Sequence, residues 1–118
     1  GRFQAQGPFT WKNFYPDYLF QNKSGVKFEN VVHTSGLNFK TKFRYGFTPY
    51  ASDFNNDGWV DLYLNNDFDT PDQMFYNING KFIEAPYNVM MQTGFYTMGI
   101  DVADINNDGL TDVLTVDM

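Results

Sequence analysis

Short apolar and aromatic runs alternate with polar turns along most of the chain. Leu62–Leu64 and Val113–Val116 together combine aliphatic, aromatic and β-branched residues, which is the composition of buried inner strands. Phe28–Val31 and Phe82–Glu84 place polar residues among apolar ones, as outer strands do. No window shows the periodicity of an amphipathic helix, and the 5 prolines further discourage helix. The pattern therefore predicts an all-β fold.

Two segments repeat each other at an offset of 55 residues. Residues 16–22 read Pro-Asp-Tyr-Leu-Phe-Gln-Asn, and residues 71–77 read Pro-Asp-Gln-Met-Phe-Tyr-Asn. Each segment is followed by a glycine turn and a Lys-Phe pair, and the dipeptides Ser-Gly and Asn-Gly in these turns are typical of hairpins. Two β-hairpins are therefore expected, at about residues 17–31 and 72–85.

A second element, Ser52–Gly58, recurs as Ala103–Gly109 at an offset of 51 residues. Each copy predicts a loop followed by a strand, over 48–65 and 97–117. Repeats of about 50 residues fit a four-stranded propeller blade. Since propellers typically close with about 4–8 blades, we expect a fragment of about two β-propeller-type blades from a larger propeller. Its predicted parts are an unassigned segment 1–15, a hairpin with its connection 16–47, a complete repeat 48–96, and the start of the next repeat 97–118.

The charge and composition of the chain exclude several classes of function. Acidic residues outnumber basic ones, 14 against 8, and the formal charge of −6 has the wrong sign for binding nucleic acid. The absence of cysteine excludes disulfide scaffolds and thiolate metal sites. No apolar run is long enough to span a membrane. The first residues do not resemble a signal peptide, so a mature or internal segment is expected.

The repeated acidic loops both have the form D-x-N-x-D-G-x-x-D. Calcium takes about six to eight oxygen ligands, so carboxylate, amide and backbone carbonyl oxygens suit it. A spacing of two residues places alternate side chains on the concave side of a tight turn, which a glycine with positive φ can close. We therefore expect two calcium sites. The predicted ligands are Asp53, Asn55, Asp57, the Trp59 carbonyl and Asp61 in the first loop, and Asp104, Asn106, Asp108, the Leu110 carbonyl and Asp112 in the second.

An EF-hand and a plain acidic turn are the two other interpretations of these loops. An EF-hand requires a Glu at position 12 between flanking helices, whereas position 12 is Leu64 in one loop and Thr115 in the other. That interpretation fails. A plain acidic turn is simpler, because Asn-Asn-Asp-Gly is common turn chemistry. A turn does not require the aspartate at position nine, Asp61 or Asp112, and both copies have it.

The loops and hairpins resemble the FG-GAP/VCBS repeats of extracellular β-propellers, which include the blades of integrin α-subunits. In that family the motif is a calcium-binding hairpin loop within a blade, followed by an apolar strand. Leu19–Asn22 and Met74–Asn77 match the hairpins of the family, and Met98–Asp104 resembles the lead-in of large bacterial ASPIC/UnbV-associated VCBS proteins. The resemblance covers roughly residues 16–118. No loop precedes the first hairpin, so two calcium sites are implied.

The resemblance implies a calcium-stabilised segment of an extracellular or bacterial cell-surface, outer membrane-associated binding protein. Its expected partners are the remaining blades of the parent protein and another surface protein or a glycan. No nucleophile-and-base set, phosphate-binding glycine loop or zinc spacing is present, so no active site is expected here. Two alternatives stay open: a propeller enzyme acting on polysaccharide through a site elsewhere in the parent, and a carbohydrate-binding or uptake-associated module of a bacterial outer surface.

Two further groups of residues have both a structural and a functional interpretation. Asp67, Asp69 and Asp72 follow the first inner strand, where a solvated acidic loop is favoured over a third metal site. A set of aromatic residues forms either packing between blades, which is favoured, or a sugar-binding platform. These residues are Trp59, Tyr63, Phe68, Tyr76, Tyr87, Phe95 and Tyr96.

Overall fold

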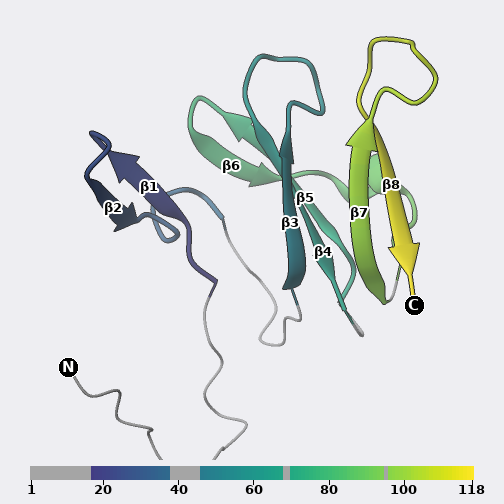
Figure 1. Ribbon diagram of the computed structural model, residues 1–118, viewed down its shortest axis with the longest axis horizontal. Coiled ribbons are helices and arrows are strands. Elements are labelled where there is room, and N and C mark those ends of the chain that lie inside the picture. The colour runs from purple at the N-terminus through teal and green to yellow at the C-terminus, as the bar shows by residue number, and fades with distance from the viewer. Residues whose placement is uncertain (1–16, 38–45, 68–69, 95) are drawn as a thin grey trace, which may run out of the picture.

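The computed structural model describes residues 17–37, 46–67, 70–94 and 96–118 (Figure 1). The unassigned segment 1–15 and most of the connection expected after the first hairpin lie outside the described residues. The described elements are β1 (Phe20–Lys23), β2 (Lys27–Asn30), β3 (Gly46–Ser52), β4 (Asp61–Asn66), β5 (Gln73–Ile78), β6 (Lys81–Glu84), α1 (Tyr87–Met90), β7 (Thr97–Ala103) and β8 (Asp112–Asp117).

All strand pairing in the described residues is antiparallel between neighbours in sequence. Strands β3, β4, β5 and β6 form one four-stranded sheet, while β1–β2 and β7–β8 each form a two-stranded sheet. Figure 1 shows β1–β2 on one side of the four-stranded sheet and β7–β8 on the other. The predicted all-β class, both hairpins and the inner strand at Leu62–Leu64 are confirmed. Val113–Val116 forms a strand as predicted, but its expected burial is wrong for the described residues, because β8 pairs there with β7 alone and Leu114 and Val116 are each 54% exposed.

The core lies on β4 and β5, the two central strands of the four-stranded sheet. Tyr63 and Phe75 are 1% and 0% exposed, and Met74 is 7% exposed. Leu62 pairs with Phe75 and Tyr63 with Met74, so each large side chain has an apolar cross-strand neighbour. The mixture of aromatic and aliphatic residues that predicts inner strands therefore corresponds to real burial at these positions.

The two hairpins that carry the acidic loops share an irregularity. The register of β3 on β4 shifts between Gly46 and Pro49, and that of β7 on β8 shifts between Thr97 and Gly99. Such bulges bend a strand and increase its twist. Because the shift occurs at the corresponding end of both hairpins, the repeat extends from sequence to backbone geometry.

One helical turn departs from the expectation of no helix. Pro86, with a φ of −58°, immediately precedes helix α1. A proline at a helix start loses no hydrogen bond, because the first N–H groups have no partner within the helix. The 4 residues of α1 are too few for a hydrophobic period to appear in the sequence. Within the described ranges, no helix has the length and apolar composition of a membrane span.

The segment after β2 joins the first hairpin to the four-stranded sheet. The backbone N–H of Phe82 donates to the Ser35 carbonyl at 2.8 Å, and the Lys81 ammonium contacts the Thr34 carbonyl. Gly36, between these contacts and the connection, has φ +89° and lies against the Phe82 backbone, where a Cβ would collide. The close approach thus depends on glycine in both respects.

Candidate metal centre

The first acidic loop connects the end of β3 at Ser52 to the start of β4 at Asp61. The two carboxylate oxygens of Asp53 accept the backbone N–H groups of Asp57, at 3.1 Å, and Gly58, at 2.8 Å. The Oδ1 atom of Asn55 accepts the same Asp57 N–H at 3.0 Å. Oxygens from Asp53 and Asn55 therefore converge on one point of the loop, as the spacing of two residues predicts.

The second half of this loop is held by Asp57. Its Oδ1 accepts the Trp59 N–H at 2.8 Å, and its Oδ2 accepts the Asn55 Nδ2–H at 2.9 Å. Asn56 has φ +57° and Gly58 has φ +89°, conformations that asparagine and glycine adopt at low cost. The short polar side chains thus accept backbone N–H groups in place of a neighbouring strand, and the segment folds back on itself.

The second loop, between β7 and β8, repeats this arrangement bond for bond. Asp104 accepts the N–H groups of Asp108 at 2.9 Å and Gly109 at 2.8 Å, and Asn106 shares the Asp108 N–H at 3.0 Å. Asp108 in turn accepts the Leu110 N–H at 2.8 Å and the Asn106 Nδ2–H at 3.0 Å. Two segments 51 residues apart therefore reach the same local structure independently.

The two loops project from the same end of their sheets (Figure 1). The Asn56 side chain of the first loop donates to the Gly109 carbonyl of the second at 3.5 Å, the limit of hydrogen-bond distance. The loops are thus neighbours in space as well as repeats in sequence.

The aspartates at position nine differ between the two loops. Asp61 is 0% exposed, and its two oxygens accept the N–H groups of Phe54 at 3.0 Å and of Asn77, on β5, at 2.8 Å. Asp112 is only half-buried, and its Oδ2 accepts the Ile105 N–H at 2.9 Å. Among the described residues, its Oδ1 has no counterpart of the Asn77 bond. Asp61 therefore joins its loop to β5 as well as closing the loop.

The atoms predicted to bind calcium fit that ion in kind. All of them are oxygens, the donors that calcium requires, and a carboxylate oxygen that accepts one N–H keeps a second lone pair. Within the described residues, no three acidic, His or Cys side chains lie close enough to hold a metal by themselves. Each loop would therefore need its asparagine and a backbone carbonyl in addition to its carboxylates. The carbonyl roles of Trp59 and Leu110 stay predictions.

A buried polar junction between the four-stranded sheet and β7 has no sequence signal. Asp72, 7% exposed, accepts the Tyr63 hydroxyl at 2.8 Å, the Thr97 hydroxyl at 3.1 Å and the Asn66 N–H at 2.8 Å. The Asn65 side chain donates to the Thr97 carbonyl at 3.1 Å. These bonds hold β7 against β4 across the space between the two sheets.

The junction also changes the acidity of Tyr63. Burial raises the pKa of its hydroxyl, and the hydrogen bond to Asp72 and the negative charges of Asp72 and Asp117 raise that pKa further. The hydroxyl therefore stays protonated and remains a donor to Asp72. Asp72 was expected in a solvated acidic loop, and this expectation is wrong because the side chain is buried in the junction. Asp69 lies outside the described residues.

The aromatic residues expected to pack between blades or to bind sugar do not form one surface. Tyr63 is buried, whereas Trp59, Tyr87 and Tyr96 are 44%, 77% and 45% exposed. Phe68 and Phe95 lie outside the described residues. The set therefore divides between core and surface, and Tyr63 is excluded from any sugar-binding platform.

Comparison with protein families gives a match. The model of the FG-GAP-like repeat matches residues 53–115, which begin at the first aspartate of one loop and end beyond the second loop. No curated protein and no solved structure matches the chain.

Proposed function

The chain belongs to the FG-GAP-like repeat family, and we propose that it is a calcium-stabilised β-propeller segment that serves as an interaction module. One observation carries the proposal. The two loops reproduce the same five side-chain bonds around Asp53, Asn55 and Asp57 and around their counterparts. A repeated arrangement of oxygens on one side of a turn is what two equivalent cation sites require.

Asp53, Asn55, Asp57, the Trp59 carbonyl and Asp61 would hold one ion, and their counterparts Asp104 to Asp112 the other. A bound calcium ion supplies a double positive charge that offsets the repulsion among the carboxylates. Asp61 leads directly into β4, and Asp112 into β8. The loop thereby fixes the start of the strand that follows. The formal charge of −6 falls in magnitude when both sites are filled.

A calcium titration by calorimetry tests the sites. Chelator-treated protein should show two binding events, with Asp57→Asn removing one and Asp108→Asn the other. Asparagine keeps an Oδ1 acceptor for the N–H two residues on, so the turn persists while the charge is lost. Asp101→Asn is the matched control, because Asp101 is an exposed aspartate of β7 outside both loops.

Thermal unfolding supplies a second readout. With calcium about 100-fold above Kd, each filled site should add about 2.7 kcal/mol to the free energy of unfolding. If folded protein gives no binding heat, or if both events survive the double substitution, the loops are acidic turns and the proposal is wrong.

We further propose an extracellular or cell-surface location. Calcium modules that work outside cells bind at about 10⁻⁴–10⁻³ M, concentrations that leave such sites empty in the cytosol. The expected Kd therefore lies in this range. The module would present its exposed surface to another surface protein or a glycan, and we propose no active site in it. Recovery of the parent protein only from the cytosol on fractionation would contradict the location.

A further inference from the structure

One hydrogen bond joins the two acidic loops to each other. The Asn56 side chain of the first loop donates to the Gly109 carbonyl of the second at 3.5 Å. Neither residue is a predicted calcium ligand, but each directly precedes one, Asp57 in the first loop and Leu110 in the second. The bond therefore connects the backbone of one predicted site to the backbone of the other.

This bond holds a peptide group that the second loop also holds. The carbonyl of Gly109 and the N–H of Leu110 belong to the same planar peptide group. The N–H donates to Asp108 within the loop at 2.8 Å, and the carbonyl accepts Asn56 from the neighbouring loop. The peptide group therefore has a partner at each end. Because it leads directly into Leu110, its orientation helps to set the position of the Leu110 carbonyl, the predicted ligand.

The first loop has no equivalent support. Its Gly58–Trp59 peptide is held at the N–H, which donates to Asp57 at 2.8 Å. Among the described residues, no side chain donates to the Gly58 carbonyl, and the Asn107 side chain makes no bond like that of Asn56. Asn56 and Asn107 occupy the same position of the two loops and have φ of +57° and +60°. Asn107 is therefore a matched control for Asn56.

The position of Asn56 depends on the fold of the first loop. The N–H that follows it, that of Asp57, is shared between Asp53 at 3.1 Å and Asn55 at 3.0 Å. All three of these neighbours are predicted ligands, and the two carboxylates among them repel each other while the site is empty. Occupancy of the first site therefore restrains the backbone that carries Asn56 and keeps its side chain directed at Gly109.

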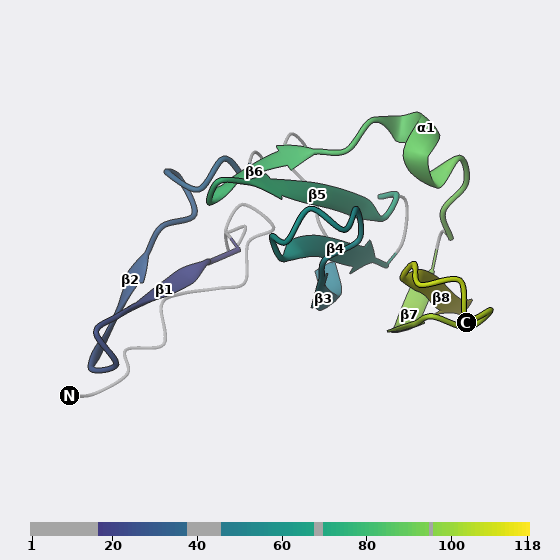
Figure 2. The ribbon, with the colours of Figure 1, turned by 90° about the horizontal axis from the view of Figure 1, so that it is seen from above.

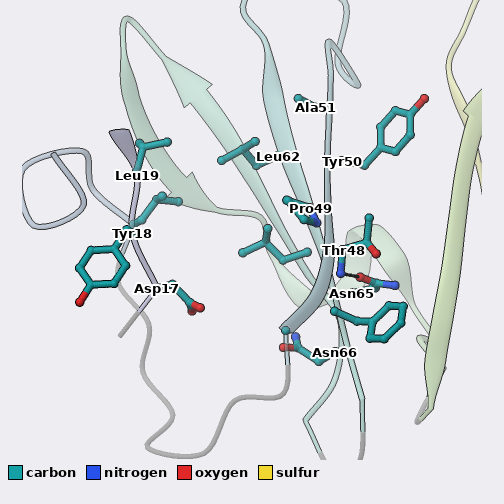
Figure 3. Close-up of a pocket in the computed structure, with 14 residues that line it drawn as sticks. Asp17, Tyr18, Leu19, Thr48, Pro49, Tyr50, Ala51, Leu62, Asn65 and Asn66 are labelled. Carbon is teal, nitrogen blue, oxygen red and sulfur yellow. Dashed lines mark hydrogen bonds between the residues drawn. The ribbon is translucent and has the colours of Figure 1, made fainter. Parts of the chain in front are cut away.

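The strands that lead into the two loops are fixed side by side at their other ends. β3 enters the first loop and β7 the second, and β7 contacts β3 and β4 (Figure 2). The buried Asn65 of β4 joins them. Its Oδ1 accepts the Thr48 N–H of β3 (Figure 3), and its Nδ2–H donates to the Thr97 carbonyl of β7 at 3.1 Å. None of these three residues is a predicted ligand, so the strands hold the loops within reach of each other whether or not calcium is bound.

We propose that Asn56 is a positioning residue for the second calcium site and couples the two sites, so that calcium at either one raises the affinity of the other. The inference rests on the calcium sites proposed above, and linkage makes the effect reciprocal. A hydrogen bond between neutral groups changes an equilibrium constant by about 2- to 10-fold, and an exposed bond at the distance limit belongs at the lower end. Filling one site should therefore raise the affinity of the other about 2- to 4-fold.

Calcium titrations by calorimetry measure this coupling. Asp57→Asn empties the first site and Asp108→Asn the second, so these variants give the affinity of each site alone. The protein with both sites should bind two ions about 2- to 4-fold more tightly than the product of the two separate affinities. Asn56→Gly should reduce this ratio to about 1, because glycine keeps the positive φ and only the side-chain donor is lost. Asn107→Gly should leave the ratio unchanged.

The outcomes distinguish the coupling from the calcium sites themselves. Two binding events with a ratio of about 1 in the unsubstituted protein would overturn the coupling and leave the proposed sites intact. A ratio that survives Asn56→Gly would overturn the role of Asn56. Absence of calcium binding in folded protein would overturn both the coupling and the sites.

Hydrogen exchange measured by NMR follows the effect from one loop to the other. In Asp108→Asn only the first site fills, and the Leu110 N–H keeps an acceptor because asparagine retains an Oδ1. Added calcium should then slow exchange of the Leu110 N–H about 2- to 4-fold, although the ion binds in the other loop. Asn56→Gly should remove this slowing, whereas Asn107→Gly should not. A Leu110 exchange rate that does not respond to calcium, or a response that persists in Asn56→Gly, would overturn the proposal.

Discussion

Replacing Asp61 by alanine tests how the first loop is tied to the sheet. The side chain is fully buried and accepts two backbone N–H groups, from Phe54 within the loop and Asn77 on β5. Its removal leaves both donors without a partner in the protein. A buried unsatisfied donor costs about 1–3 kcal/mol, so Asp61→Ala should lower the free energy of unfolding by about 2–6 kcal/mol.

The repeat supplies a matched control in Asp112→Ala. Asp112 is half-buried and accepts one N–H, from Ile105, which water can reach after the substitution. This variant should lose only about 1 kcal/mol. Urea unfolding in chelator, at low protein concentration, measures both variants without a contribution from bound calcium. Equal losses for the two variants would refute the argument that Asp61 links loop and sheet.

Three further outcomes are expected. Because the pKa of Tyr63 is raised in the folded state, the tyrosine of the unfolded chain ionises first as pH rises above about 10. The free energy of unfolding should therefore fall by up to about 1.4 kcal/mol per pH unit above about pH 10. Urea titrations across this pH range should show a flatter dependence for Tyr63→Phe. Thr97→Val removes a fully buried hydroxyl that donates to Asp72; it should cost about 1–3 kcal/mol and speed hydrogen exchange in β7 and β8, and unchanged exchange would contradict the role of the junction. Gly58→Ala should cost about 1–2 kcal/mol through its positive φ alone, because no atom lies near the added Cβ. Gly36→Ala should cost more, because the added Cβ would also collide with the Phe82 backbone. Thermal unfolding that ranks the two variants in the reverse order would refute this comparison.

The local elements of this chain could be predicted because their causes are local. Asn-Gly and Ser-Gly turns fix the hairpins, since the positive φ of Asn79, Gly80 and Gly25 suits asparagine and glycine. The acidic loops fold through bonds that span at most seven residues, as in the Ile105–Asp112 contact. The side chains that accept these N–H groups can therefore be predicted from their spacing in the sequence alone.

Local sequence patterns do not predict the short helix α1. A proline is compatible both with a helix break and with a helix start, and a single turn has too few side chains to show an amphipathic pattern. The sequence predicted no helix there, and only the path of the chain from β6 to β7 determines that Pro86 begins a turn.

The sequence by itself determined the all-β class, the hairpins, the repeat offsets and the residues of both loops. Only the tertiary structure decided that Asp72 is a buried hydrogen-bond partner of Tyr63 and Thr97. The contact between Thr97 and Asp72 spans 25 residues of sequence. The tertiary structure also decided that Asp61 is buried and bonded to β5 while Asp112, in an identical motif, is half-exposed. The physical reason is that burial and long-range hydrogen bonds depend on which sheet packs beside a residue, and two copies of one motif can have different neighbours.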